Sequence, residues 1–128
     1  MSKKIVFLFA VLAFLSCKKE SQEPFGKPQE TAIEAKTPEA LGKEIFEGKG
    51  NCVACHQVDQ KIVGPSIQEI AKIYKEKNGD IVTFLKGDSK PLVDPSQFEV
   101  MKTNFAITEE MSDEELEALE AYISSNLK

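Results

Sequence analysis

The chain has 128 residues, of which 29% are charged, and its formal net charge is −5 at pH 7. A chain of this length has room for one domain of ordinary size. It contains no arginine, and an acidic chain without arginine lacks the basic surface on which nucleic-acid binding depends, so we expect no nucleic acid among its partners.

The first 16 residues predict an export signal. Lys3 and Lys4 precede an apolar run that is too short to span a membrane as a stable helix and that ends at the small residue Ser16. Residues 1–16 are therefore interpreted as a signal peptide, and we expect the protein to be exported.

Cys17 follows this signal directly, in the order Phe14-Leu15-Ser16-Cys17. The arrangement resembles the lipobox of bacterial lipoproteins, in which the cysteine becomes the acylated first residue. An unpaired thiol in an exported protein otherwise needs an explanation of its own, and several acyl chains together anchor a protein stably. The resemblance implies a lipid anchor at Cys17 on the periplasmic side of a bacterial membrane. The alternative is an ordinary signal peptide followed by an incidental cysteine.

Residues 17–36 are polar, contain Pro24 and Pro28, and show no sustained periodicity. This composition predicts a flexible, lipid-anchored tether, or a leader that acts only as a spacer. The folded domain is expected at residues 37–128.

The domain begins with a predicted helix over 38–48. Thr37 suits the N-cap, Pro38 suits the first helical position, and Leu41, Ile45 and Phe46 form an apolar stripe. Gly42 costs this helix about 1 kcal/mol relative to alanine. We therefore expect another element to approach the helix closely at that position.

The most specific motif is the CxxCH pentapeptide at Cys52, Cys55 and His56. Two thiols on one turn can each add to a haem vinyl group, and the imidazole that follows can ligate the iron. A zinc site needs four such ligands, and the soluble part of the chain offers these three. A redox dithiol is usually found beside a βαβ unit, and none is visible in the sequence. The motif predicts one covalently attached haem c, with His56 as the proximal iron ligand.

Three further helices are predicted, and no convincing strand. Ser66 begins a capping box with Glu69, and the helix that follows ends at Asn78 and Gly79. A short helix follows the cap Asp80 and ends at Gly87. The last helix runs from Asp113 to about Asn126 behind a second capping box, formed by Ser112 and Glu115. The predicted fold is all-α, with about four helices around one haem.

The sixth iron ligand separates the possible functions, and the candidates are Met101, Met111, a lysine or no protein group. Met111 precedes the cap Ser112 and is placed to form a hydrophobic staple with Leu116. Met101 lies in the long segment 87–111, which lacks regular periodicity but is rich in apolar residues. This difference favours Met101 as the ligand.

Taken together, these segments resemble the small bacterial class I cytochromes c, and most of all the single-haem carriers of the c-551 or c8 type. The resemblance is carried by residues 42–46, the CxxCH motif, Val63-Gly64-Pro65-Ser66 and residues 119–123.

The resemblance implies three contacts. The Pro65 carbonyl would accept a hydrogen bond from the His56 ring, and Met101, in the loop before the last helix, would ligate the iron. The first helix would pack across the last one at four positions, here Gly42, Phe46, Leu119 and Tyr122.

The predicted function is that of a membrane-tethered electron carrier in a respiratory chain, not an enzyme. Its expected partners are redox proteins that donate and accept electrons, such as a quinol-oxidising complex or a terminal oxidase. The alternatives are an open-site haem protein, either peroxidase-like or a gas sensor, and a fixed cytochrome subunit of a larger respiratory complex. The acidic run between Glu109 and Glu120 is either a solvated helix face or a docking surface for a basic partner.

Overall fold

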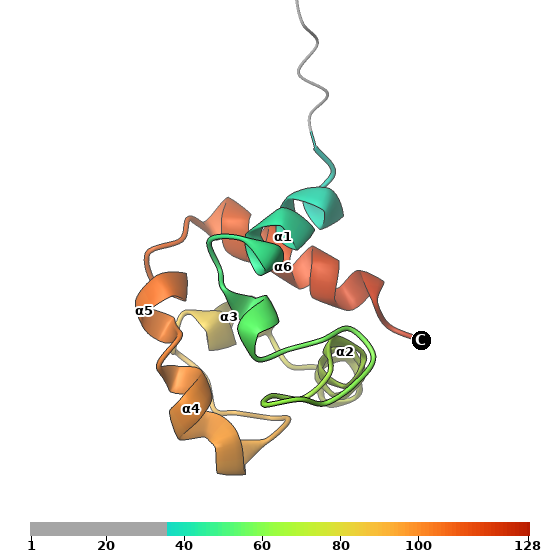
Figure 1. Cartoon of the computed structure of the whole chain (residues 1–128), viewed down its shortest axis with the longest axis vertical. Coiled ribbons are helices and arrows are strands. Elements are labelled where there is room, and N and C mark those ends of the chain that lie inside the picture. Colours follow the sequence, from blue (N-terminus) through green and yellow to red (C-terminus); the bar gives the residue numbers. More distant parts are fainter. Residues whose placement is uncertain (1–35) are drawn as a thin grey trace, which may run out of the picture. The chain divides into compact units, whose positions relative to one another are not determined.

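The computed structural model describes residues 36–128, so the predicted signal peptide, the lipidation site Cys17 and most of the predicted tether lie outside the described residues. The described part is helical (Figure 1). It holds no β-strand, only an isolated bridge between His56 and Lys61. No helix within it is long and apolar enough to cross a membrane. Its elements in chain order are α1 (Pro38–Glu47), η1 (Cys52–Ala54), α2 (Ile67–Lys77), α3 (Ile81–Leu85), η2 (Pro95–Gln97), α4 (Phe98–Lys102), α5 (Phe105–Thr108) and α6 (Asp113–Ser125).

The four helices predicted from the sequence are α1, α2, α3 and α6, and each begins at its predicted cap. The side chains of Thr37, Ser66, Asp80 and Ser112 all accept hydrogen bonds from backbone N–H groups in the first turn of their helices. The capping box at Ser112 is complete. At Ser66, in the part of the chain that the structure describes, only the bond from the Glu69 N–H to Ser66 Oγ is present, at 3.1 Å, so that predicted box is half formed.

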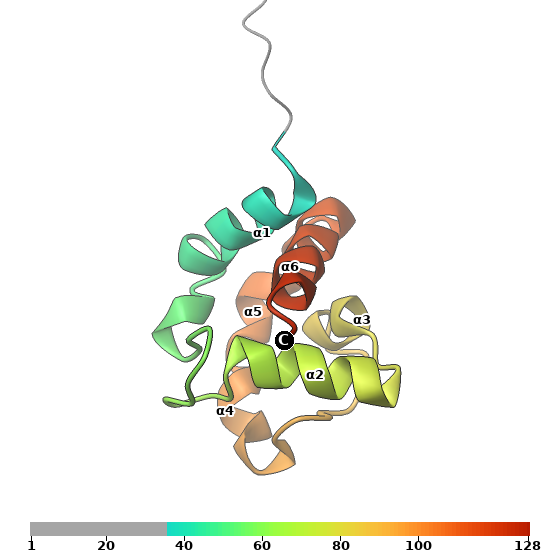
Figure 2. The same ribbon diagram turned by 90° about the vertical axis from the view of Figure 1, so that its right-hand side faces the viewer.

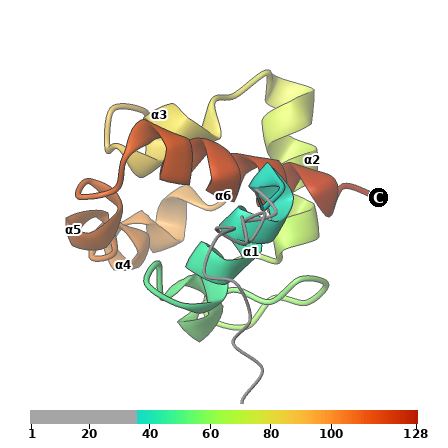
Figure 3. The same cartoon turned by 90° about the horizontal axis from the view of Figure 1, so that it is seen from above.

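Helices α1 and α6 cross in close contact (Figures 2 and 3). A Cβ atom at Gly42 would lie 1.9 Å from the Ala118 carbonyl oxygen and 2.8 Å from Tyr122 Cβ, so only glycine fits at the crossing. One turn further on, the rings of Phe46 and Tyr122 meet with their centroids 5.3 Å apart. The close approach expected at Gly42 is therefore confirmed, and its partner is the backbone of α6.

Helices α2 and α3 also pack on α6, and together with α1 they enclose the core. Burying these apolar side chains is the main source of stability in a domain of this size. The most deeply buried residues of the core are Ile67, Leu116, Leu119 and Ala118.

The segment 87–111 differs from the prediction, because it contains η2, α4 and α5 instead of an irregular loop. These elements have three to five residues each and no side-chain cap, so neither periodicity nor a capping signal marks them in the sequence. An aromatic cluster holds the segment: the rings of Phe98 and Phe105 lie 6.0 Å apart, and both contact Phe84 of α3.

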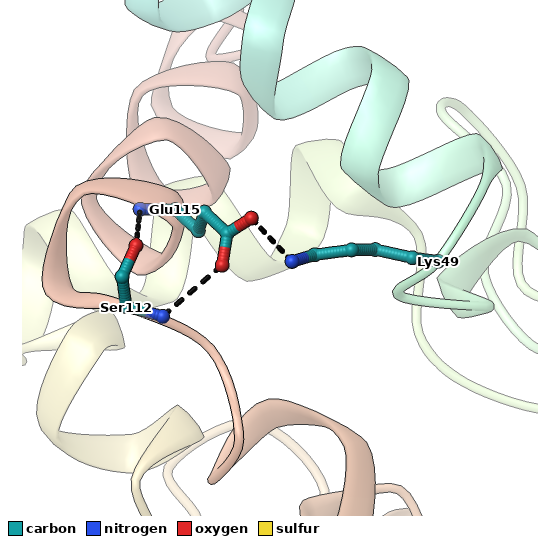
Figure 4. Close-up of polar contacts among 3 residues, drawn as sticks. All are labelled: Lys49, Ser112 and Glu115. Carbon is teal, nitrogen blue, oxygen red and sulfur yellow. Dashed lines mark hydrogen bonds and ion pairs between the residues drawn. The ribbon is translucent and has the colours of Figure 1, made fainter.

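Lys49, in the turn after α1, is joined to the start of α6 (Figure 4). Its ammonium group pairs with the Glu115 carboxylate, which also accepts the backbone N–H of Ser112 at 3.1 Å. The hydrogen bond from Lys49, followed by that from Ser112, lowers the pKa of Glu115. This contact fixes the end of α1, and with it the chain that leads into the CxxCH motif, against α6.

Candidate functional site

A cavity of about 230 Å³ opens into the core beside the CxxCH motif. Its wall is mostly apolar and is formed by residues from every helix except α5, together with the chain around the motif. Its apolar lining includes Phe46, Val63, Ile67, Ile70, Ile81, Phe84, Leu85, Val93, Val100, Leu119 and Ile123.

All three functional residues of the motif line this cavity. Asn51, in the left-handed conformation with φ 52°, turns the chain into η1. The backbone N–H groups of Cys55 and His56 then both bond to the Cys52 carbonyl, at 3.1 and 2.9 Å. This tight turn places the two thiols and the imidazole on one wall of the cavity.

The Cys52 thiol lacks the lowered pKa of a reactive redox cysteine. Burial, with a smaller contribution from Cys55, raises the pKa of the Cys52 thiol to about 11. Reactive dithiols have thiol pKa values that are lowered, to about 3.5–7.5.

The His56 imidazole is held in one orientation. Its Nδ1 lies 2.7 Å from the Pro65 carbonyl oxygen, and because a carbonyl can only accept, Nδ1 carries the proton. Gly64 packs against the ring, where a Cβ would lie 2.5 Å from His56 Cε1. The lone pair of Nε2 is thereby left for a metal, which is the usual tautomer of a ligating histidine.

The two candidate methionines occupy different environments. Met101, on α4, is partly buried and lines the same cavity as His56. Met111 is only 8% exposed, belongs to the hydrophobic core with Leu116, and is not among the residues that line the cavity. The structure thus brings Met101 together with the CxxCH motif and places Met111 elsewhere.

Two polar contacts tie the Met101 segment to the chain before and after the motif. Asn104 Nδ2 donates to the Gly50 carbonyl at 3.2 Å, and Lys61 Nζ pairs with the Asp94 carboxylate at 2.9 Å. Helix α4 itself has no buried residue. These contacts and the aromatic cluster therefore position Met101.

Part of the surface at the cavity is apolar, because Val63 and Val100 are exposed and line its wall. Every large hydrophobic residue that is exposed in the described part of the chain lies in or just after the motif or on α4: Val53, Val58, Ile62, Val63 and Val100. None of the acidic residues between Glu109 and Glu120 lines the cavity. Sequence reasoning missed this apolar surface because exposure depends on the fold.

The donor set fits a covalently attached haem. Two thiols lie on one turn, an imidazole has its Nε2 lone pair available, a thioether comes from a separate segment, and the space between is lined by apolar side chains. Cys52 and Cys55 would hold the porphyrin, and His56 and Met101 would face the iron.

Comparison with known proteins agrees with this geometry. The family model "Cytochrome c" matches residues 39–126. Cytochrome c-552 of Nitrosomonas europaea is 50% identical over 42 residues, which are 33% of this chain and 40% of that protein. Cytochrome c-551 of Pseudomonas denitrificans is 43% identical over 51 residues, or 40% of this chain and 60% of the relative. Cytochrome c-551 of Azotobacter vinelandii is 42% identical over 38 residues, which are 30% of this chain and 45% of that protein.

The aligned segments span roughly half the length of these relatives, whereas the family match spans most of the described domain. The chain belongs to the cytochrome c family, as a bacterial class I member that carries one covalently attached haem c.

Proposed function

We propose that the protein is an electron-transfer carrier in which His56 and Met101 ligate the haem iron on its two faces. The observation that carries this proposal is that both residues line one cavity, whereas Met111 is buried in the core. When bound, the iron supplies one-electron exchange between Fe(III) and Fe(II), and thioether ligation favours the reduced form.

The other residues of the site attach the haem and orient its histidine ligand. Cys52 and Cys55 form the thioether bonds, and the Pro65 carbonyl fixes the His56 ring and increases its basicity. The apolar wall excludes water from the cofactor. With His56 and Met101 both bound to the iron, no coordination position would be open for peroxide or a gas, so the protein would act as a carrier and not as an enzyme.

Electrons are exchanged through the apolar surface around Val53, Val63 and Val100, where a redox protein can approach the cofactor closely. The acidic run is a solvated face in this scheme. Two of its members are paired within the chain, since Glu115 contacts Lys49 and Asp113 contacts Lys86.

Electron self-exchange between oxidised and reduced protein, followed by NMR line broadening, tests this docking surface. Val63→Glu should slow exchange strongly, because it places a charge on the docking face. Glu117→Gln, on the exposed face of α6, should leave the rate nearly unchanged. The opposite ranking would assign docking to the acidic run.

The carrier is proposed to work on the periplasmic side of a bacterial membrane, where it receives electrons from and passes them to proteins of a respiratory chain. The support is the sequence of residues 1–36, with its predicted signal peptide, Cys17 and the predicted polar tether. Cys17→Ser should move the protein from the membrane to the soluble exported fraction. Retention of this variant in the membrane would contradict the lipid anchor.

The visible spectrum of the exported protein tests the ligation. The oxidised protein should be low-spin, with the weak far-red band of Fe(III)–thioether bonding, and the reduced protein should not bind carbon monoxide. A high-spin spectrum with ready carbon monoxide binding would contradict the carrier proposal and would indicate an open-site haem protein instead.

A further inference from the structure

Tyr74, on α2, carries a hydroxyl group that the protein itself leaves without a partner. The residue is 5% exposed, and among residues 36–128 its Oη is the one buried side-chain oxygen or nitrogen without a hydrogen bond. A buried hydroxyl without a partner costs free energy that phenylalanine at the same place would not. An unpaired group of this kind indicates a partner other than the polypeptide.

The ring is held rigidly, so the hydroxyl is not free to turn toward solvent. The Tyr74 ring contacts that of Phe84 edge to face, at 6.2 Å between centroids. Gly79 also lies so close to the ring that a Cβ there would be 2.8 Å from Tyr74 Cδ1. Tyr74 also lines the haem cavity. Its position is therefore fixed by the fold before any ligand is considered.

Haem c brings two carboxylate groups into this protein, and the chain supplies few donors for them. The chain has no arginine and no tryptophan, and no lysine is among the described residues that line the cavity. Thr103 donates to the Val100 carbonyl at 2.7 Å, and Asn104 donates to the Gly50 carbonyl. The other amide donors on the wall, Asn51 and Gln97, are exposed.

We infer that the Tyr74 hydroxyl donates a hydrogen bond to one carboxylate of the haem. A hydrogen bond to an ionised acceptor is among the stronger ones, and it satisfies both buried groups at once. Burial, with a contribution from the Asp80 carboxylate, raises the pKa of Tyr74 to about 12, so the donor keeps its proton at neutral pH.

The test is Tyr74→Phe in the haem-loaded protein, with Tyr122→Phe as the matched control. Tyr122 is the chain's other tyrosine; it lies between α1 and α6 and does not line the cavity. In Tyr74→Phe, the resonance Raman bands of the haem carboxylate groups should shift. The reduction potential should also fall, because a carboxylate that has lost its donor keeps more negative charge near the iron and favours Fe(III). Both quantities should stay at the wild-type values in Tyr122→Phe.

A second measurement needs no substitution. In NMR spectra of the reduced wild-type protein, the Tyr74 hydroxyl proton should exchange slowly and show cross-relaxation with the methylene protons of a haem carboxylate arm. Unchanged Raman bands and potential in Tyr74→Phe, or a hydroxyl proton in contact with water alone, would overturn the inference. The inference does not depend on the proposed ligation by Met101, which the visible spectra of the same samples test separately.

Discussion

Replacing Gly42 by alanine should destabilise the protein, although alanine is the better helix former. In a helix interior, alanine is favoured over glycine by about 1 kcal/mol. The new Cβ would lie 1.9 Å from the Ala118 carbonyl oxygen. Carbon–oxygen contacts ordinarily lie at about 3.3–3.6 Å, so α1 and α6 would have to separate by roughly 1.4 Å. Overpacking in a close-packed core costs about 1–3 kcal/mol. Because the partner here is a rigid backbone carbonyl, we take the upper value, about 3 kcal/mol. Subtracting the helix-forming advantage of alanine leaves an expected net loss of stability of about 2 kcal/mol.

Denaturant unfolding of the haem-loaded protein measures this difference. Lys43 is the next residue on α1 and is exposed, so a comparison of Lys43→Ala with Lys43→Gly gives the intrinsic advantage of alanine in the same helix. That advantage should be about 1 kcal/mol in favour of alanine. If Gly42→Ala is as stable as the wild-type protein, or more stable by the amount measured at Lys43, the close crossing of α1 and α6 is refuted.

The other predictions concern the haem site. Gly64→Ala should lower the yield of covalent haem and change the reduction potential, because its Cβ would lie 2.5 Å from His56 Cε1; an unchanged yield and potential would contradict the packing under the imidazole. Hydrogen bonds from Ser96 and Lys61 lower the pKa of Asp94 to about 2. The stabilisation from this carboxylate is therefore complete above its unfolded pKa of about 3.9 and is lost as the pH falls toward the folded value. Lys61→Met should move the acid-induced change in the haem spectrum to higher pH, whereas Lys72→Met, which removes an exposed ion pair with Glu76, should not. Cys55→Ser should sharply reduce covalent haem, as measured on denaturing gels.

The parts of the fold that are encoded locally could be predicted from the sequence. Ser112 and Glu115 mark the start of α6 because a capping box is a contact between residues three apart. The CxxCH motif likewise fixes the chemistry of the site within five residues. Gly42 indicated a close contact, and only the structure shows that the partner is the Ala118 carbonyl.

What the sequence did not reveal depends on tertiary contacts. Helix α4 has five residues and none of them is buried, so no apolar periodicity distinguishes it from a loop. The role of Tyr74 could not be predicted from the sequence, since an unpaired hydroxyl is visible only once its surroundings are known. The same holds for Val100, whose exposure next to the cavity could not be read from its residue type.

The measurement that tests the account most directly is the absorption spectrum of Met101→Ala beside that of Met111→Leu, each oxidised, reduced and exposed to carbon monoxide. Met101→Ala should lose the weak far-red band of the oxidised protein and bind carbon monoxide when reduced, because it removes the thioether that lines the cavity. Met111→Leu should keep both wild-type properties, since it replaces a core side chain by one of similar volume. Loss of the band in Met111→Leu, or its retention in Met101→Ala, would contradict the assignment of Met101 as the sixth ligand.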